Sequence, residues 1–151
     1  AGGAVIRAGQ QHLAQHAPDY ASGVGPIMAC HHHLAKCSNK YWACYKMLDD
    51  SDVTYTISAN TSGCSDPDGC FAPGFNDNVD SVAGINVNPN SPHGVCFTFA
   101  HEMAHACAYE SGKDWQSQTA ADRFASSVLK DLLECEPPHP GDLPPPLEPR
   151  N

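Results

Sequence analysis

The amino-acid sequence predicts one small α+β domain, in which a helix with two histidines packs on a second helix beside a small β-sheet. Three observations lead to this class. The run from Phe97 to Ala106 is apolar and contains no proline or glycine, as an internal helix requires. Residues 53–57 alternate in the manner of a strand, and residues 82–87 offer another short strand. The eight cysteines include no Cys-x-x-Cys pair, so disulfides are favoured over zinc knuckles.

The first elements are set by proline and glycine breaks. Residues 3–16 read as one helix that ends near Pro18. The Gly25-Pro26 pair introduces a longer helix over about residues 27–48. The triplet His31-His32-His33 lies in that helix, where three consecutive side chains point in three directions, so we assign it a structural or surface role.

The cysteines predict how the domain is held together. Cys30, Cys37 and Cys44 recur at intervals of seven, so a helix there shows three cysteines along one stripe and can be linked to three different neighbours. Cys64 and Cys70 bracket a short turn-rich segment and are predicted to bond to each other. Because disulfides persist in oxidising compartments, we expect the protein to be exported. The start at an alanine is interpreted as the product of processing or as a chosen boundary.

The middle of the chain is expected to form the sheet and the rim of a cleft. The strand at 82–87 precedes a turn at 88–92 rich in asparagine and proline. Loops around residues 62–75 and 84–94 contain glycine and are expected to shape the rim. The domain is expected to end at residue 135, and residues 136–151 form a proline-rich tail without regular secondary structure.

The segment His101-Glu102-Met103-Ala104-His105 carries the chemistry. On a helix, His101 and His105 lie one turn apart on the same face, so both imidazoles can bind one zinc ion. Glu102 flanks that ion and is predicted to act as the general base for zinc-bound water. Tyr109, one further turn along, is a candidate donor to the oxyanion. This pattern is typical of zinc peptidases.

A catalytic zinc site needs a third protein ligand, and it must come from downstream. Residues 111–115 predict a turn, and residues 116–135 a second, amphipathic helix. In an antiparallel helix pair, residues equally distant from the turn lie side by side, which brings Asp122 level with His105. We therefore prefer Asp122 as the third zinc ligand. The other acidic residues considered were Asp114, Asp131 and Glu134.

From the HExxH segment through Ala120-Ala121-Asp122-Arg123-Phe124-Ala125 to Cys135, the chain resembles the aspzincins, the deuterolysin-like zinc endopeptidases. The resemblance covers residues 96–135 and implies a zincin-like fold. It implies Zn²⁺ bound by His101, His105 and Asp122, with Glu102 as the base. A weaker resemblance, to HExxH proteins with a Glu-x-x-Ala-Asn-x-Phe-Ala segment, would place the third ligand at Gln118. Glutamine is a poor zinc ligand, so Asp122 is preferred.

Composition limits the partners. The 151 residues carry a net charge of −9 with only eight lysines and arginines, which argues against a nucleic-acid or anionic-membrane surface. No apolar run approaches the length of a membrane span. We expect a secreted, monomeric zinc endopeptidase acting on peptides or proteins. The alternatives are a toxin, effector or amidase module processed from a larger precursor, and a secreted disulfide-rich binding module without activity.

Overall fold

The computed structural model describes residues 24–73 and 82–135. The helix predicted at 3–16 and the tail predicted at 136–151 lie outside the described residues. Within them the chain is α+β, as predicted. In chain order the elements are α2 (Val24–Cys37), α3 (Asn39–Asp49), β1 (Thr54–Ser58), β2 (Gly69–Ala72), β3 (Val82–Val87), α4 (Val95–Glu110) and α5 (Gln118–Glu134).

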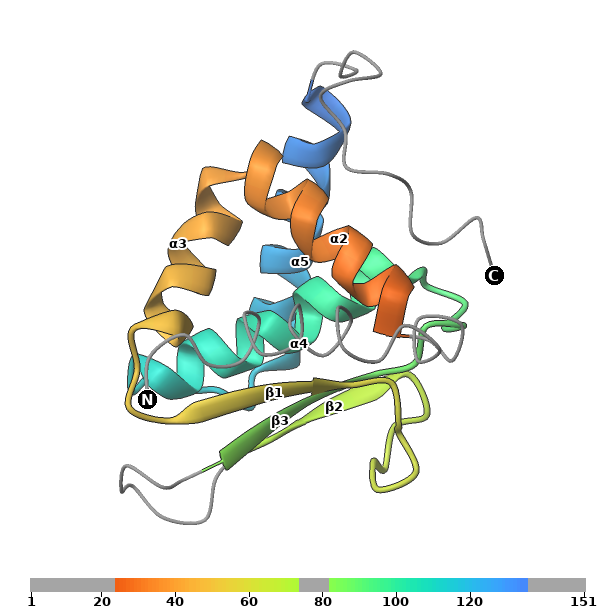
Figure 1. Ribbon diagram of the computed structural model, residues 1–151, viewed down its shortest axis with the longest axis vertical. Coiled ribbons are helices and arrows are strands. Elements are labelled where there is room, and N and C mark those ends of the chain that lie inside the picture. The colour runs from red at the N-terminus through yellow and green to blue at the C-terminus, as the bar shows by residue number, and fades with distance from the viewer. Residues whose placement is uncertain (1–23, 74–81, 136–151) are drawn as a thin grey trace.

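Helix α4 occupies the middle of the fold. Figure 1 shows it running between the sheet on one side and α2, α3 and α5 on the other. Its buried residues include Phe99 and Met103, both fully inaccessible to solvent. The predicted packing of the histidine-bearing helix on the following helix is confirmed, because α4 and α5 pack along each other.

The sheet has three strands in the order β1-β3-β2. Strands β1 and β3 are parallel, and β2 pairs antiparallel with β3, so β2 forms one edge. The strands predicted at 53–57 and 82–87 are confirmed within a residue. Strand β2 lies inside the loop predicted at 62–75. It was missed because four residues are too few to show an alternation.

Gly69 permits the close pairing of β2 with β3. A Cβ at this position would lie 2.4 Å from the carbonyl oxygen of Asn86, closer than two such atoms can approach. The first residue of β2 therefore has to be glycine for the strand to reach its partner in this register.

The single helix predicted over 27–48 is wrong, because the chain forms two helices that meet at Ser38. Ser38 has an extended backbone, and its hydroxyl accepts a hydrogen bond from the amide of Tyr41, capping α3. The same hydroxyl donates to Asp131 of α5, at 2.7 Å. These two hydrogen bonds of the Ser38 hydroxyl stabilise the chain as two helices that meet at this residue.

Four disulfides tie the elements together, and the described residues contain no free cysteine. The predicted bond between Cys64 and Cys70 is confirmed. The three helical cysteines reach two neighbouring helices and not three, because two of them bond to α4 and one bonds at the end of α5. Removing one such bond from a small domain typically costs about 2–5 kcal/mol of stability. The other three bonds are Cys30–Cys96, Cys37–Cys135 and Cys44–Cys107.

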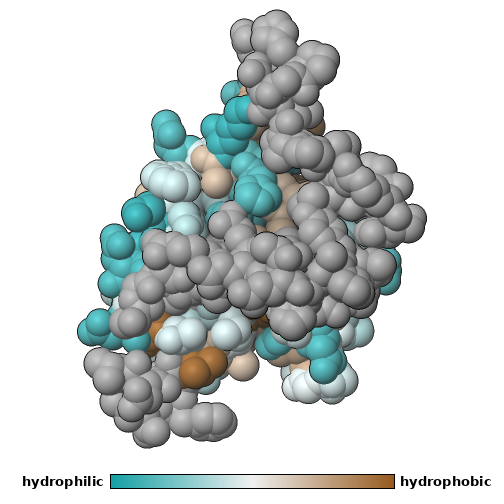
Figure 2. All heavy atoms as spheres, viewed as in Figure 1, coloured by the Kyte–Doolittle hydropathy of each residue, from teal (hydrophilic) through white to brown (hydrophobic). Residues whose placement is uncertain are grey.

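The coloured part of the face in Figure 2 is mostly teal or white, with brown confined to small separate areas. No helix among the described residues is both long and apolar enough to span a membrane. Within residues 24–73 and 82–135, the exposed large apolar side chains are Trp42, Met47, Val82 and Leu133.

His31 belongs to the core rather than to a binding site. Its ring is 3% exposed, and its Nδ1 shares a hydrogen bond with the Tyr41 hydroxyl at 2.7 Å. Burial, and secondarily the neighbouring His32, lowers the pKa of His31 from 6.5 to about 3. The structural role assigned to this position of the triplet is confirmed.

His31 is therefore expected to make stability depend on pH. Between pH 6.5 and about 3 the unfolded chain binds a proton at His31 that the folded chain does not. The stability that the neutral, buried His31 ring contributes is complete above pH 6.5. It is lost as the pH falls, by up to about 1.4 kcal/mol per pH unit. In urea unfolding at pH 7, 6 and 5, the free energy of unfolding of His31→Gln should fall less steeply with decreasing pH than that of the wild type or of the control His33→Gln. Equal slopes for all three proteins would contradict this assignment.

Candidate metal centre

The HExxH segment lies in the middle of α4, as predicted. His101 and His105 are one turn apart with ring centroids separated by 4.7 Å, and Glu102 and His105 are 5% and 6% exposed. One potential ligand atom from each of these three side chains lies within 4.8 Å of the others. The cluster can hold a metal ion.

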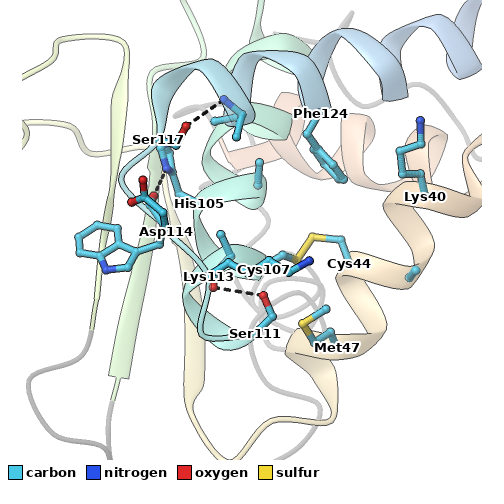
Figure 3. Close-up of a pocket in the computed structure, with 16 residues that line it drawn as sticks. Lys40, Cys44, Met47, His105, Cys107, Ser111, Lys113, Asp114, Ser117 and Phe124 are labelled. Atoms are coloured by element: carbon cyan, nitrogen blue, oxygen red, sulfur yellow. Dashed lines mark hydrogen bonds between the residues drawn. A yellow bond between two sulfur atoms is a disulfide. The ribbon is translucent and has the colours of Figure 1, made fainter.

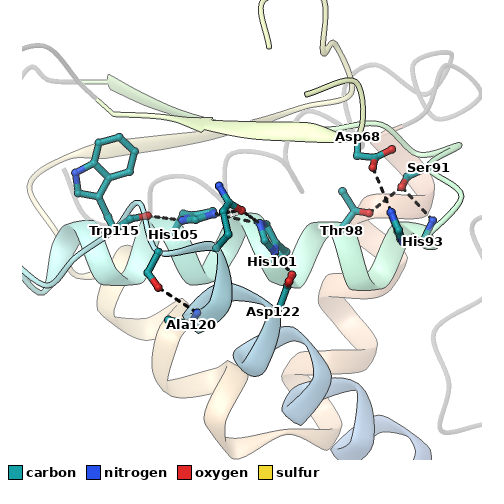
Figure 4. Close-up of polar contacts among 11 residues, drawn as sticks. Asp68, Ser91, His93, Thr98, His101, His105, Trp115, Ala120 and Asp122 are labelled. Carbon is teal, nitrogen blue, oxygen red and sulfur yellow. Dashed lines mark hydrogen bonds and ion pairs between the residues drawn. The ribbon is translucent and has the colours of Figure 1, made fainter. Parts of the chain in front are cut away.

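Both histidine rings are oriented by acceptors at Nδ1. His101 Nδ1 donates to the Asp122 carboxylate at 2.8 Å, and His105 Nδ1 donates to the main-chain carbonyl of Trp115. Since a carboxylate and a carbonyl only accept, the proton of each ring is placed on Nδ1, which leaves a lone pair on Nε2. The two Nε2 atoms face each other at 3.1 Å (Figure 4). Histidines that bind metals through Nε2 usually have Nδ1 hydrogen-bonded in this way.

The predicted third ligand and its alternative occupy different positions. Asp122 contacts Nδ1 of His101, whereas Gln118 faces the Nε2 atoms, with Oε1 at 2.8 Å from that of His101 and 3.4 Å from that of His105. Both residues come from the first turns of α5. This helix begins where the Ser117 hydroxyl accepts from the Ala120 amide. The ligand role of Asp122 stays a prediction.

The Glu102 carboxyl is an unusually strong base for its type. Burial, together with the nearby charge of Asp66, raises the pKa of Glu102 to about 8. Burial also lowers the pKa of His105, against the opposing effect of the Trp115 carbonyl, and this favours the neutral imidazole that binds metals.

Two adjoining cavities open beside the cluster, of about 300 and 340 Å³. Both are lined by Asp66, His101, Glu102 and Gln118. One continues towards Asp68, and the other towards Phe71 on the edge strand β2. Among the described residues no lysine or arginine lines either cavity, so the cleft is acidic.

Tyr109 has a packing position. Its ring lies 5.5 Å from Phe71 and 6.1 Å from Trp115, between centroids, in an aromatic cluster between the sheet and the α4–α5 turn. It is not among the described residues that line the two cavities. The oxyanion role stays a prediction without a contact to support it.

A third cavity, of about 330 Å³, lies between α3, α4 and α5 (Figure 3). Met47, Phe124 and the Cys44–Cys107 disulfide contribute to a mainly apolar lining. His101 and Glu102 do not reach it among the described residues, so it does not unite the groups that carry chemistry.

Sequence reasoning missed two contributors to the site. The carbonyl of Trp115 is a main-chain group, which no side-chain pattern reveals. Asp66 lies in the turn-rich segment between Cys64 and Cys70, and the predicted disulfide was the available signal that this segment is held in place. The loop around 62–75 was correctly expected at the cleft rim.

No known protein family matches this chain. Nor does any curated protein or solved structure. The site is therefore judged on its own geometry, and the likeness to aspzincins rests on the residues that carry it.

The metal centre leads to a prediction with an internal control. His101→Ala and His105→Ala should each lose nearly all bound Zn²⁺, because each removes one prepared Nε2 donor. His93→Ala, which changes another cleft-lining histidine, should retain it. Metal content after dialysis against excess Zn²⁺ and gel filtration measures this, and thermal melting checks that each variant is folded. Retention of zinc by both His101→Ala and His105→Ala would rule out the site.

Proposed function

We propose that this protein is a zinc-dependent endopeptidase of zincin-like type. The observation that carries the proposal is the pair of His101 and His105 Nε2 atoms, set 3.1 Å apart by acceptors on both Nδ1 atoms, with the Glu102 carboxyl beside them. With both Nδ1 atoms donating to their acceptors, the two Nε2 atoms are free to bind one cation, and this supports a metal site beside Glu102.

The donor set fits zinc. Imidazole nitrogens suit Zn²⁺, and the carboxylate of Asp122 and the carbonyl of Trp115 are the outer partners that zinc-bound histidines usually have. When bound, zinc polarises the scissile carbonyl and acidifies a water molecule.

Glu102 is the residue that moves the proton. Its carboxylate takes a proton from the attacking water and returns it to the leaving amine. The raised pKa of the buried Glu102 side chain supports the second half of this task, because a protonated Glu102 can donate to the leaving amine. A bound cation would lower this pKa and so favour the carboxylate that the first half requires.

The acidic cleft and β2 supply the binding surface. Gly69, Cys70 and Phe71 of this edge strand line the larger cavity, where an extended peptide can pair with the main chain. Hydrogen bonds of that kind recognise a backbone and not a particular side chain, which suits an endopeptidase. Four disulfides support the further proposal that the enzyme acts outside the cell.

The base assignment predicts a specific pattern of loss. Glu102→Gln should lower kcat on an internally quenched peptide by about 10²–10⁴-fold and should keep its zinc, because it removes the base and leaves both imidazoles. Glu134→Gln, an exposed change at the end of α5, is the matched control and should retain wild-type turnover. A Glu102→Gln enzyme with more than a tenth of wild-type turnover would refute the role of Glu102.

The acidic lining predicts a preference for basic substrates. A set of peptides that differ only by Lys, norleucine or Glu beside the scissile bond should be ranked in that order by kcat/KM. Each charge contact is expected to change the rate by up to about fivefold, as for a partly exposed ion pair. The Lys-to-Glu ratio should shrink between 50 mM and 500 mM salt, because salt screens such contacts. A ratio near one at low salt would contradict the preference.

A further inference from the structure

Three electron-pair acceptors converge on one point beside α4. They are Nε2 of His101, Nε2 of His105 and Oε1 of Gln118, with mutual separations of 3.1, 2.8 and 3.4 Å. The hydrogen of each imidazole is held at Nδ1 by Asp122 or by the Trp115 carbonyl, and an amide oxygen carries none. In the neutral tautomers that these acceptors favour, both Nε2 atoms carry lone pairs, and the Gln118 oxygen faces them.

We infer that Gln118 supplies the third protein donor to the metal through its side-chain oxygen, and that Asp122 positions His101 instead of binding the ion. The inference rests on the proposed metal site and names a residue of that site. Three lone pairs at such short range repel one another unless a proton or a metal cation lies between them, and only a metal cation contacts all three at once.

Two of the three separations are close to those of a tetrahedral site. Ligands about 2.05 Å from zinc in tetrahedral geometry lie about 3.3 Å from each other; the observed 3.1 and 3.4 Å are near that value, and the 2.8 Å between His101 Nε2 and Gln118 Oε1 is shorter. The Asp122 oxygen contacts Nδ1 of His101, and Nδ1 carries the proton, so it does not complete this triangle. Its carboxylate makes the ring a stronger ligand and fixes its orientation.

The electrical balance of the site also follows. Two imidazoles and an amide are neutral, as in zinc sites with three histidines, so the protein donors leave the full charge of the ion uncompensated. The carboxyl groups of Glu102, Asp66 and Asp122 line the cavity around the donors instead. This arrangement favours a strongly acidified water at the expense of zinc affinity.

Zn²⁺ binding to the purified protein tests the assignment without any substrate. Competition with a chromophoric chelator gives the zinc affinity of the wild type, Gln118→Ala, Gln118→Glu, Asp122→Asn and the control Thr119→Ala. We expect Gln118→Ala to weaken binding by about 10²-fold or more and Gln118→Glu to strengthen it by at least about tenfold, because a carboxylate replaces a neutral donor. Asp122→Asn should cost about 10–100-fold, as outer partners do. Thr119→Ala should match the wild type.

Co²⁺ absorption spectra separate a ligand from a positioning residue. Asp122→Asn should keep the wild-type band shape at saturating Co²⁺, and Gln118→Glu should shift it. Zinc affinity unchanged in Gln118→Ala, together with a metal-free Asp122→Asn, would overturn the inference and make Asp122 the ligand, with the proposed function intact. A wild-type protein that binds no zinc would overturn both. Gln118 is exposed at the start of α5, and Gln118→Glu keeps its shape, so that variant decides the question even if the alanine variant melts early.

Discussion

The burial of helix α4 is the constraint on which the rest of the structure depends. The helix is covered by the sheet on one side and by α2, α3 and α5 on the other, yet it must leave two imidazoles open to a cleft. Fully buried side chains such as Phe99 and Met103 contribute about 1.5–3 kcal/mol each and fix its rotation. Disulfides from Cys96 and Cys107, near its two ends, fix its position along the axis. Once rotation and position are set, His101 and His105 can face only the cleft.

Short-range patterns predicted most of the elements around this helix. Periodicity located α4 and α5, and alternation located β1 and β3, because each of these signals lies within one segment. The break at Ser38 was not predictable in that way. It depends on a hydroxyl that caps α3 and also reaches Asp131, which lies 93 residues away in the sequence. Strand β2 was missed for a related reason: four residues become a strand through pairing with β3.

In the candidate site, too, the features that depend on local spacing were predicted and those that depend on tertiary packing were not. The HExxH spacing placed His101, Glu102 and His105 correctly because a helix repeats regularly. Counting residues from the turn placed Asp122 level with His105, whereas its carboxylate contacts His101, one turn earlier in α4. The count could not say which ring nitrogen the carboxylate contacts, since that depends on the rotation of α5 about its axis. One turn of that helix separates Gln118, which faces Nε2 of His101, from Asp122, which contacts its Nδ1.

The loop between Cys64 and Cys70 contributes to the pKa of Glu102. Asp66 lies on the segment between Cys64 and Cys70, and their disulfide closes this loop immediately before β2 pairs with β3. Burial raises the pKa of Glu102 to about 8, and the carboxylate that the loop brings near it adds to the shift. In the proposed mechanism, a neutral donor at Gln118 would acidify a metal-bound water, while Asp66 would make Glu102 more basic. Both effects would act on the same proton transfer, so the disulfide loop and the first turn of α5 would together influence how readily that proton moves.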